Sequence, residues 1–201
     1  MPALVGDPVA ANTTTLKQTL DHEDLQFFAW IHPSEDLLPF LERWEDLIDG
    51  LKFHGPISQV AIEDRTVRPY LEFANDRGLP VLYHCGRNPI SWADHLKLVA
   101  PIYPHVNFSV GHAGGAAMGR ALITMKTWSA LPENVYVETS TIRWPKLLRR
   151  MVETWGEEKV LYGSDLPFVD ERVQWYVIMV AGLDDNEAFL GGNLQRLLKN
   201  R

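Results

Sequence analysis

Five side chains of the kinds used in metal sites and acid–base catalysis recur along this chain at nearly even intervals. They are His54, His84, His112, Glu138 and Asp165. Successive members lie about 26 to 30 residues apart, roughly the length of a strand, a loop, a helix and a return loop. The spacing therefore predicts that each residue ends one strand in a series of strand–helix units. Because the carboxyl ends of parallel strands face one mouth, we expect these side chains to gather there.

Three of these residues are of the types that bind a divalent metal ion. Zinc takes imidazole and carboxylate ligands, and a catalytic site uses about three protein ligands while one position stays open for water. Water in that position reaches a pKa near 7 and becomes a nucleophile. We therefore predict a divalent ion, zinc first, at His84, His112 and Asp165. A single histidine at a strand end is more often a hydrogen-bonded structural residue, but here three separate strands agree.

The remaining polar residues near the strand ends admit two interpretations each. Lys52 and His54 lie two apart on one strand and therefore point to the same side. If that side is the interior, they serve as a substrate anchor or proton donor, and otherwise they are packed or exposed. Arg87 follows a strand and either contacts the substrate or lies on the surface, while Glu138 is either a catalytic or a buried hydrogen-bonding residue. Three histidines are predicted to be structural or exposed: His32, His95 and His105.

Six segments have the composition of strands that could position these residues. They are residues 25–32, 48–55, 79–86, 106–115, 134–140 and 159–168. Helical patterns lie between them, at 34–46, 65–78, 91–104, 117–132, 145–156, 171–183 and 186–200. Repeated strand–helix units imply a parallel sheet, either a barrel or a doubly wound sheet. Ligand-type residues at four or five successive strand ends favour the barrel, so we predict an α/β fold of the (β/α)8 type, incomplete, with about six units.

The bulk properties narrow the class of protein. The chain has 201 residues, enough for one domain. We expect residues 25–201 to form that domain and residues 1–24 to be poorly ordered or the remnant of something longer. The net charge is −7, which argues against nucleic-acid binding. A single cysteine fits a reducing, cytoplasmic compartment, and without a run of 18 apolar residues no membrane span is expected. A small-molecule substrate is the expected partner.

Several of these segments together resemble one known family. The segments are GLKFHG, LPVLYHCG, HVNFSVGHAGG, NVYVETS and VLYGSDLPF, with a closing GGNLQRLL. They resemble the amidohydrolase-related TIM-barrel proteins over residues 25–200. That group includes metal-dependent hydrolases, among them lactone hydrolases, and decarboxylases similar to aminocarboxymuconate-semialdehyde decarboxylase. The resemblance implies that His84 binds the metal ion, that His112 polarises substrate or water beside it, and that Asp165 contacts the ion or its water and acts as the base.

The chain departs from the family pattern at its beginning. The family's first strand carries His-x-His or Glu-x-His, which supplies two metal ligands, and no such strand occurs here. Residues 25–32 correspond to the third strand, so the first two are expected to be missing. His84 and Asp165 alone would bind a metal ion weakly unless His112, His54 or another chain joins them. Two unpaired sheet edges would invite pairing with another chain, so we expect a homo-oligomer or a partner chain that covers the missing strands.

These observations lead to one principal functional hypothesis and two alternatives. The principal one is a metal-dependent hydrolase that acts on a small carbonyl or carboxylate compound. In it Asp165 is the general base, His112 stabilises the developing oxyanion, and Lys52, His54 and Arg87 contact the substrate. The first alternative is a non-oxidative decarboxylase on the same scaffold. The second is an inactive fragment, or a subunit that needs a partner to complete the metal site.

Overall fold

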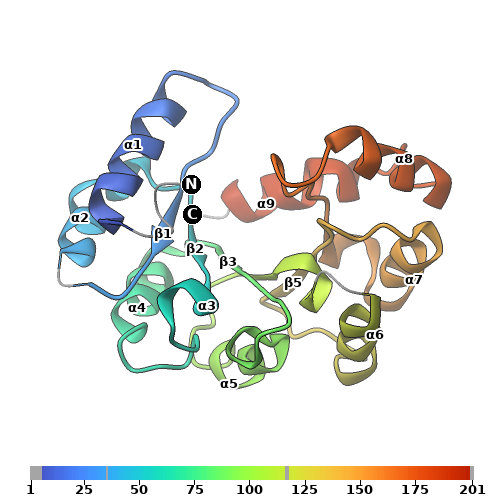
Figure 1. Ribbon diagram of the computed structural model, residues 1–201, viewed down its shortest axis with the longest axis horizontal. Coiled ribbons are helices and arrows are strands. Elements are labelled where there is room, and N and C mark those ends of the chain that lie inside the picture. The colour runs from blue at the N-terminus through green and yellow to red at the C-terminus, as the bar shows by residue number, and fades with distance from the viewer. Residues whose placement is uncertain (1–5, 35, 116–117, 200–201) are drawn as a thin grey trace.

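A six-stranded parallel sheet forms the centre of the computed structural model, which describes residues 6–34, 36–115 and 118–199 (Figure 1). The strands pair in chain order, from β1 to β6. Their bounds are β1 Phe28–Ile31, β2 Gly50–Phe53, β3 Val81–Tyr83, β4 Phe108–Val110, β5 Val135–Glu138 and β6 Val160–Leu161. Each lies inside a predicted strand segment, so the predicted α/β fold is confirmed. The sheet is the incomplete barrel that the repeat predicted.

Alternation along the strands separates two faces of the sheet. Ala29, Leu51 and Val81 are fully buried on the face that packs against helices. The alternate residue of each strand points to the other face. Trp30, Lys52 and Leu82 are such residues, and they pair with one another across neighbouring strands. Phe28 of β1 and Leu161 of β6 line the same cavity, although they lie on the two outermost strands. The sheet therefore curls around that cavity, and the second face is the interior of the open barrel.

Helices follow the strands and surround the sheet in Figure 1. Their bounds are α2 Leu37–Arg43, α3 Gly55–Ser58, α4 Arg68–Arg77, α5 Leu96–Val99, α6 Met118–Thr127, α7 Pro145–Trp155, α8 Glu171–Ala181 and α9 Asn193–Lys199. Helix α7 begins at Pro145 and stops before Gly156, as the sequence predicted. The segment predicted as one proline-broken helix at 91–104 is instead a series of short turns and the four-residue α5. None of the helices in the described ranges is long and apolar enough to cross a membrane.

The amino-terminal segment differs from its sequence-based expectation. Residues 1–24 were expected to be poorly ordered or a remnant; helix α1 spans Pro8–Leu20, and residues 1–5 lie outside the described residues. Asp7 caps the helix by accepting hydrogen bonds from the backbone N–H groups of Val9 and Ala10. The polar composition concealed one buried face, formed by Ala11, Asn12 and Leu16.

The buried face of α1 places Asn12 against the edge of the sheet. Its side-chain amide donates a hydrogen bond to the carbonyl oxygen of Trp30 at 3.0 Å, and its side-chain oxygen accepts one from the Trp30 N–H at 2.7 Å. The side chain thereby supplies both hydrogen bonds that a neighbouring strand would give this residue of β1. The backbone of Trp30 at this edge is therefore hydrogen-bonded, whereas the missing first two strands led us to expect an unpaired edge.

A second asparagine has a comparable place at the opposite edge. Asn193, at the start of α9, donates to the carbonyl oxygens of Glu157 and Val160 at 2.7 and 2.8 Å. Just beyond β6, the N–H of Tyr162 donates to the carbonyl oxygen of Phe189 at 3.1 Å. Both edges of the sheet thus have hydrogen-bond partners from within the chain.

Replacing Asn12 by alanine is expected to lower the free energy of unfolding by about 2–4 kcal/mol. The substitution leaves two backbone groups of β1 without partners. Because both are only part-buried, each costs about 1–2 kcal/mol, the lower part of the range for buried groups. The matched control is Thr14→Ala on the exposed side of the same helix, where the hydroxyl bonds only to the carbonyl oxygen of Ala10. Urea unfolding of both variants measures the difference. Equal midpoints would show that α1 is not docked through Asn12.

Candidate active site

Four of the five predicted strand-end residues line one cavity at the carboxyl ends of the strands. The cavity has a volume of about 230 Å³ and is lined by Trp30, Lys52, His54, Ile57, His84, His112, Asp165 and Phe168. We call it the mouth. His54, His84, His112 and Asp165 follow β2, β3, β4 and β6 respectively. The structure therefore brings together side chains that the spacing alone related.

Aromatic stacking holds two of the mouth histidines. The rings of His54 and His84 stack with centroids 3.6 Å apart and an interplanar angle of 16°. Trp30 stacks on the other side of His54, at a centroid distance of 5.8 Å. His112 meets His84 edge-on, with centroids 5.0 Å apart, and its Nε2 lies 3.2 Å from Nδ1 of His84. Few rotations remain open to these rings.

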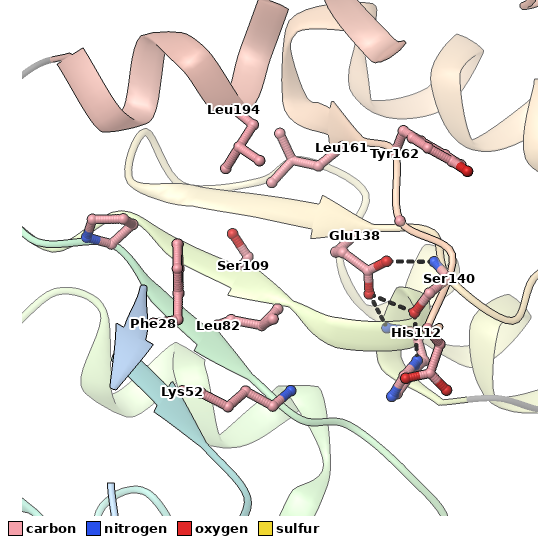
Figure 2. Close-up of a pocket in the computed structure, with 13 residues that line it drawn as sticks. Phe28, Lys52, Leu82, Ser109, His112, Glu138, Ser140, Leu161, Tyr162 and Leu194 are labelled. Carbon is pink, nitrogen blue, oxygen red and sulfur yellow. Dashed lines mark hydrogen bonds between the residues drawn. The ribbon is translucent and has the colours of Figure 1, made fainter. Parts of the chain in front are cut away.

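Behind the mouth, His112 is anchored by residues of the β5 end. Its Nδ1 lies 2.7 Å from Oγ of Ser140, and this oxygen lies 2.8 Å from Oε2 of Glu138. The backbone N–H groups of His112 and Ser140 also donate to the Glu138 carboxylate (Figure 2). Glu138 is therefore a hydrogen-bonding residue, which was one of its two sequence interpretations. Ser140 was not predicted, because its partner is 28 residues away in the chain.

Backbone strain is concentrated at the same strand ends. Positive φ angles occur at His112 (54°), Ala113 (50°), Thr141 (67°) and Asp165 (62°). A non-glycine residue in the left-handed region costs about 1–2 kcal/mol, and such conformations cluster at functional sites. These left-handed residues turn the chain sharply where β4 and β6 end, and the turns direct His112 and Asp165 into the mouth.

The electrostatic environment keeps the imidazoles of His54 and His84 neutral. Burial lowers the pKa of His84 to about 2, and the nearby His54 and Lys52 contribute in the same direction. Burial also lowers the pKa of His54 to about 4, with Lys52 as the second cause. The pKa of Lys52 is itself lowered by burial, against the opposing charges of Glu138 and Asp165. Neutral imidazole is the form that binds metal ions.

Acidification is expected to destabilise the metal-free protein, kept in chelator. The pKa values of His54 and His84 are lower in the folded state than the unfolded value of about 6.5, so below that pH the unfolded chain binds more protons. Stability is therefore lost as the pH falls from about 7 to 5. Replacing both histidines by asparagine should reduce the slope of the unfolding free energy against pH. The reduction is at most the contribution of one bound proton for each histidine. Urea unfolding at both pH values measures the slopes, and equal slopes would contradict the assignment.

A second cavity, of about 270 Å³, extends from the mouth into the barrel interior. Its inner wall is apolar and includes Phe28, Pro80, Leu82, Leu161 and Leu194. Lys52, His112 and Asp165 line both this inner cavity and the mouth. Figure 2 shows Lys52 extending toward the group around His112. Lys52 and His54 thus face the interior, which decides between the two interpretations of their strand.

The other residues singled out from the sequence lie away from the mouth. Arg87 is exposed and lines neither cavity. His95 bonds to the carboxylate of Glu63 at 2.6 Å and to the carbonyl oxygen of Pro89 at 2.8 Å, a structural role as predicted. His105 is exposed. Sequence reasoning missed Trp30 and Phe168 in the mouth, although the position of Trp30 two residues before the end of a predicted strand was an available signal.

The donor atoms of the mouth fit a divalent ion in type and, for one pair, in spacing. Two nitrogen ligands of one ion, each about 2.1 Å from it, lie roughly 3.0–3.4 Å apart. The separation of 3.2 Å between Nε2 of His112 and Nδ1 of His84 falls in this range. Within the described residues, however, no group of three His, Cys, Asp or Glu side chains could hold a metal ion. The described part of the chain therefore offers a partial ligand set.

A family model described as amidohydrolase matches residues 11–199. This chain belongs to the amidohydrolase family. The match confirms the resemblance seen in the sequence, and it extends over helix α1. The family comprises metal-dependent hydrolases and decarboxylases. The similar solved structures include proteins named as amidohydrolases and as decarboxylases, and one of them contains bound manganese. No curated protein sequence matches this chain.

Solved structures show the same fold. An uncharacterised TIM-barrel protein from Bordetella bronchiseptica is 18% identical with a TM-score of 0.75, over 93% of this chain and 71% of that one. The 5-carboxyvanillate decarboxylase of Sphingomonas paucimobilis is 16% identical with a TM-score of 0.71, over 95% and 72%. A dihydroxybenzoic acid decarboxylase from Polaromonas, with bound manganese and the inhibitor 2-nitroresorcinol, is 20% identical with a TM-score of 0.72, over 100% and 80%.

Proposed function

We propose that this amidohydrolase-family chain is a metal-dependent hydrolase that acts on a small carbonyl or carboxylate compound. One observation carries the proposal: Lys52, His112 and Asp165 line both the mouth and the apolar inner cavity. A substrate whose apolar body fills the inner cavity would end beside an amine, an imidazole and a carboxylate. The inner cavity, of about 270 Å³, lies just below the usual range for drug-sized ligands and therefore suits a smaller molecule.

The residues of the mouth have complementary parts in such a reaction. Asp165 is the general base that takes the proton from the attacking water. Lys52 holds the negative charge of the substrate carboxylate, or the charge that develops on the carbonyl oxygen. His84 and His112 would present one pair of nitrogen donors to a divalent ion, and Asp165 would contact that ion or its water. His54 supports His84 through their ring stack. When bound, the ion supplies Lewis-acid chemistry toward the substrate's oxygen atoms.

Hydrolysis is tested with protein that has been freed of metal and then reloaded with zinc or manganese. The loaded protein should open small lactones or cleave small esters and amides, and Asp165→Asn should not. Activity that is equal with and without metal would contradict the metal requirement. A loaded protein that turns over no member of these classes would contradict hydrolysis itself.

Decarboxylation is the second candidate, favoured by the apolar wall of the inner cavity. Phe28, Leu82 and Leu161 form a surface that suits the ring of an aromatic acid or the chain of an unsaturated one. Several of the similar structures are named as decarboxylases of aromatic acids. Release of ¹³CO2 from carboxyl-labelled aromatic acids discriminates this reaction from hydrolysis, because hydrolysis of an ester or lactone releases none.

A subunit that needs another chain is the remaining candidate, and the partial ligand set favours it. His84, His112 and Asp165 face the mouth, yet the described residues contain no complete group of three ligands. A second chain would then supply the missing ligands, either as another copy or as a different protein. Equilibrium dialysis measures how tightly the protein binds zinc, and light scattering measures its oligomeric state. The two together test whether a second chain is needed. A monomer that binds one zinc ion tightly would exclude it.

A further inference from the structure

The hydrogen bonds around Glu138 fix the direction of every donor near His112. The Glu138 carboxylate receives three donors, namely the backbone N–H of His112, the backbone N–H of Ser140 and the Ser140 hydroxyl. An ionised carboxylate only accepts hydrogen bonds. Ser140 therefore uses its single hydroxyl hydrogen on Oε2 of Glu138. Its oxygen retains lone pairs, and one of them faces Nδ1 of His112 at 2.7 Å.

The donor for that remaining contact is the histidine ring. Since Ser140 Oγ has no second hydrogen, Nδ1 of His112 carries the proton and donates it to Oγ. When the ring is neutral, Nε2 then has no hydrogen, and this nitrogen presents a lone pair toward His84. A neutral imidazole has one donor and one acceptor nitrogen, and the partner of one nitrogen determines the role of the other.

We propose that Glu138 and Ser140 are positioning residues that hold His112 in the tautomer with the proton on Nδ1. The Nε2 atom of His112 is then a ligand or proton acceptor in the mouth, and not the hydrogen-bond donor to an oxyanion that the sequence suggested. The catalytic meaning of this tautomer rests on the proposed function, whereas the tautomer itself does not.

Burial and backbone geometry support a dedicated arrangement. His112 is 7% and Ser140 3% exposed, so water does not compete strongly for these hydrogen bonds. The Glu138 carboxylate also receives the N–H of His112, whose φ of 54° is unfavourable for a residue with a side chain. One carboxylate thus restrains both the backbone and, through Ser140, the ring. Gly163 makes the approach possible, because a Cβ atom there would overlap Oε1 of Glu138.

The same geometry bears on which protons would have to move if a metal ion bound to His84 and His112. In the metal-free protein, Nδ1 of His84 is the donor and Nε2 of His112 the acceptor of the 3.2 Å contact between the rings. For an ion to be held by both nitrogen atoms, the hydrogen on Nδ1 of His84 would have to move to Nε2 of the same ring or to solvent, whereas no proton would have to leave Nε2 of His112. The Glu138–Ser140 pair therefore keeps one ligand atom ready. Partners of this kind, behind a metal ligand, typically change metal affinity by about 10–100-fold when they are removed.

Nitrogen NMR of the metal-free protein tests the tautomer directly. The two tautomers of ¹⁵N-labelled histidine differ in the chemical shifts of Nδ1 and Nε2. We expect His112 of the wild type to carry its proton on Nδ1. Ser140→Ala should give a mixture of tautomers, and Ser140→Thr, which keeps the hydroxyl, should restore the wild-type pattern. The control Ser109→Ala removes another hydroxyl that lines the inner cavity and should leave His112 unchanged.

A wild-type His112 with its proton on Nε2 would overturn the proposal even if every variant failed to fold. An unchanged tautomer in folded Ser140→Ala would overturn the role of Ser140. The second readout is zinc affinity, which should fall by about 10–100-fold in Ser140→Ala and recover in Ser140→Thr. Failure of the hydrolase and decarboxylase assays, with the tautomer as expected, would reject the proposed function and leave the positioning role intact.

Discussion

Replacing Asp165 by asparagine is expected to lower kcat by about 10²–10⁴-fold, the usual contribution of a general base. Among the residues that the structure describes, Asp165 is the only acidic one that lines the mouth. The substitution removes its charge and leaves the size and shape of the side chain nearly unchanged. Asparagine also tolerates the left-handed backbone that Asp165 adopts at φ 62°. We therefore expect loss of turnover without loss of the fold. The measurement is kcat of the metal-loaded protein on the substrate that the wild type converts.

Asp170→Asn provides the matched control for that experiment. Asp170 lies five positions further along, is exposed, and caps α8 by accepting a hydrogen bond from the N–H of Arg172. Asparagine is as good a cap as aspartate, so neither kcat nor the fold should change. If Asp165→Asn retained the wild-type kcat, Asp165 would not be the general base. Nε2 of His112 would then be the candidate base.

The architecture could be predicted from the sequence because the repeat is encoded locally. Each short apolar segment with a polar residue at its end becomes a buried strand followed by a loop, and β2 and β3 lie inside their predicted segments. Proline at the start and glycine at the end delimited α7. The convergence of His84, His112 and Asp165 then follows from parallel pairing, because parallel strands place their carboxyl ends together.

What the sequence did not reveal depends on partners far apart in the chain. In the sequence, Asn12 is one polar residue beside three threonines, and its importance arises from the backbone of Trp30, 18 positions away. Ser140 is similarly unremarkable until the curl of the sheet brings it to His112, 28 positions away. Arg87 follows β3 as a ligand-contacting residue would, but its loop leaves it exposed. Local patterns determine elements, whereas these contacts depend on how the elements pack.

The edges of the sheet illustrate the same distinction. Counting strands led to the expectation of two unpaired edges that another chain would cover. In the structure, Asn12 bonds to the backbone of β1 and Asn193 to that of β6. A side-chain amide carries one donor group and one acceptor, so it reproduces the hydrogen bonding of a neighbouring strand at a single residue. The number of strands in the sequence does not predict that a side chain takes the place of a neighbouring strand at these edges.

Replacing Gly163 by alanine is expected to reduce both stability and activity. The added Cβ atom would overlap Oε1 of Glu138, so the carboxylate must move away from the N–H groups of His112 and Ser140. Overpacking of this kind costs about 1–3 kcal/mol, and for a chain of this length each kcal/mol lowers Tm by about 2–4 °C. Thermal unfolding and kcat of the metal-loaded variant measure the two effects.

Gly119→Ala separates this steric effect from the general effect of adding a methyl group. Gly119 is the second residue of α6, and a Cβ atom there would meet nothing within 4 Å. Alanine should therefore stabilise the helix, by no more than the roughly 0.5–1 kcal/mol of a mid-helix glycine. The two substitutions are chemically identical and should shift Tm in opposite directions. A Gly163→Ala variant with wild-type Tm and kcat would mean that Glu138 can leave its three donors at no cost. In that case the restraint on His112 would have to come from the ring stack of Trp30, His54 and His84 alone.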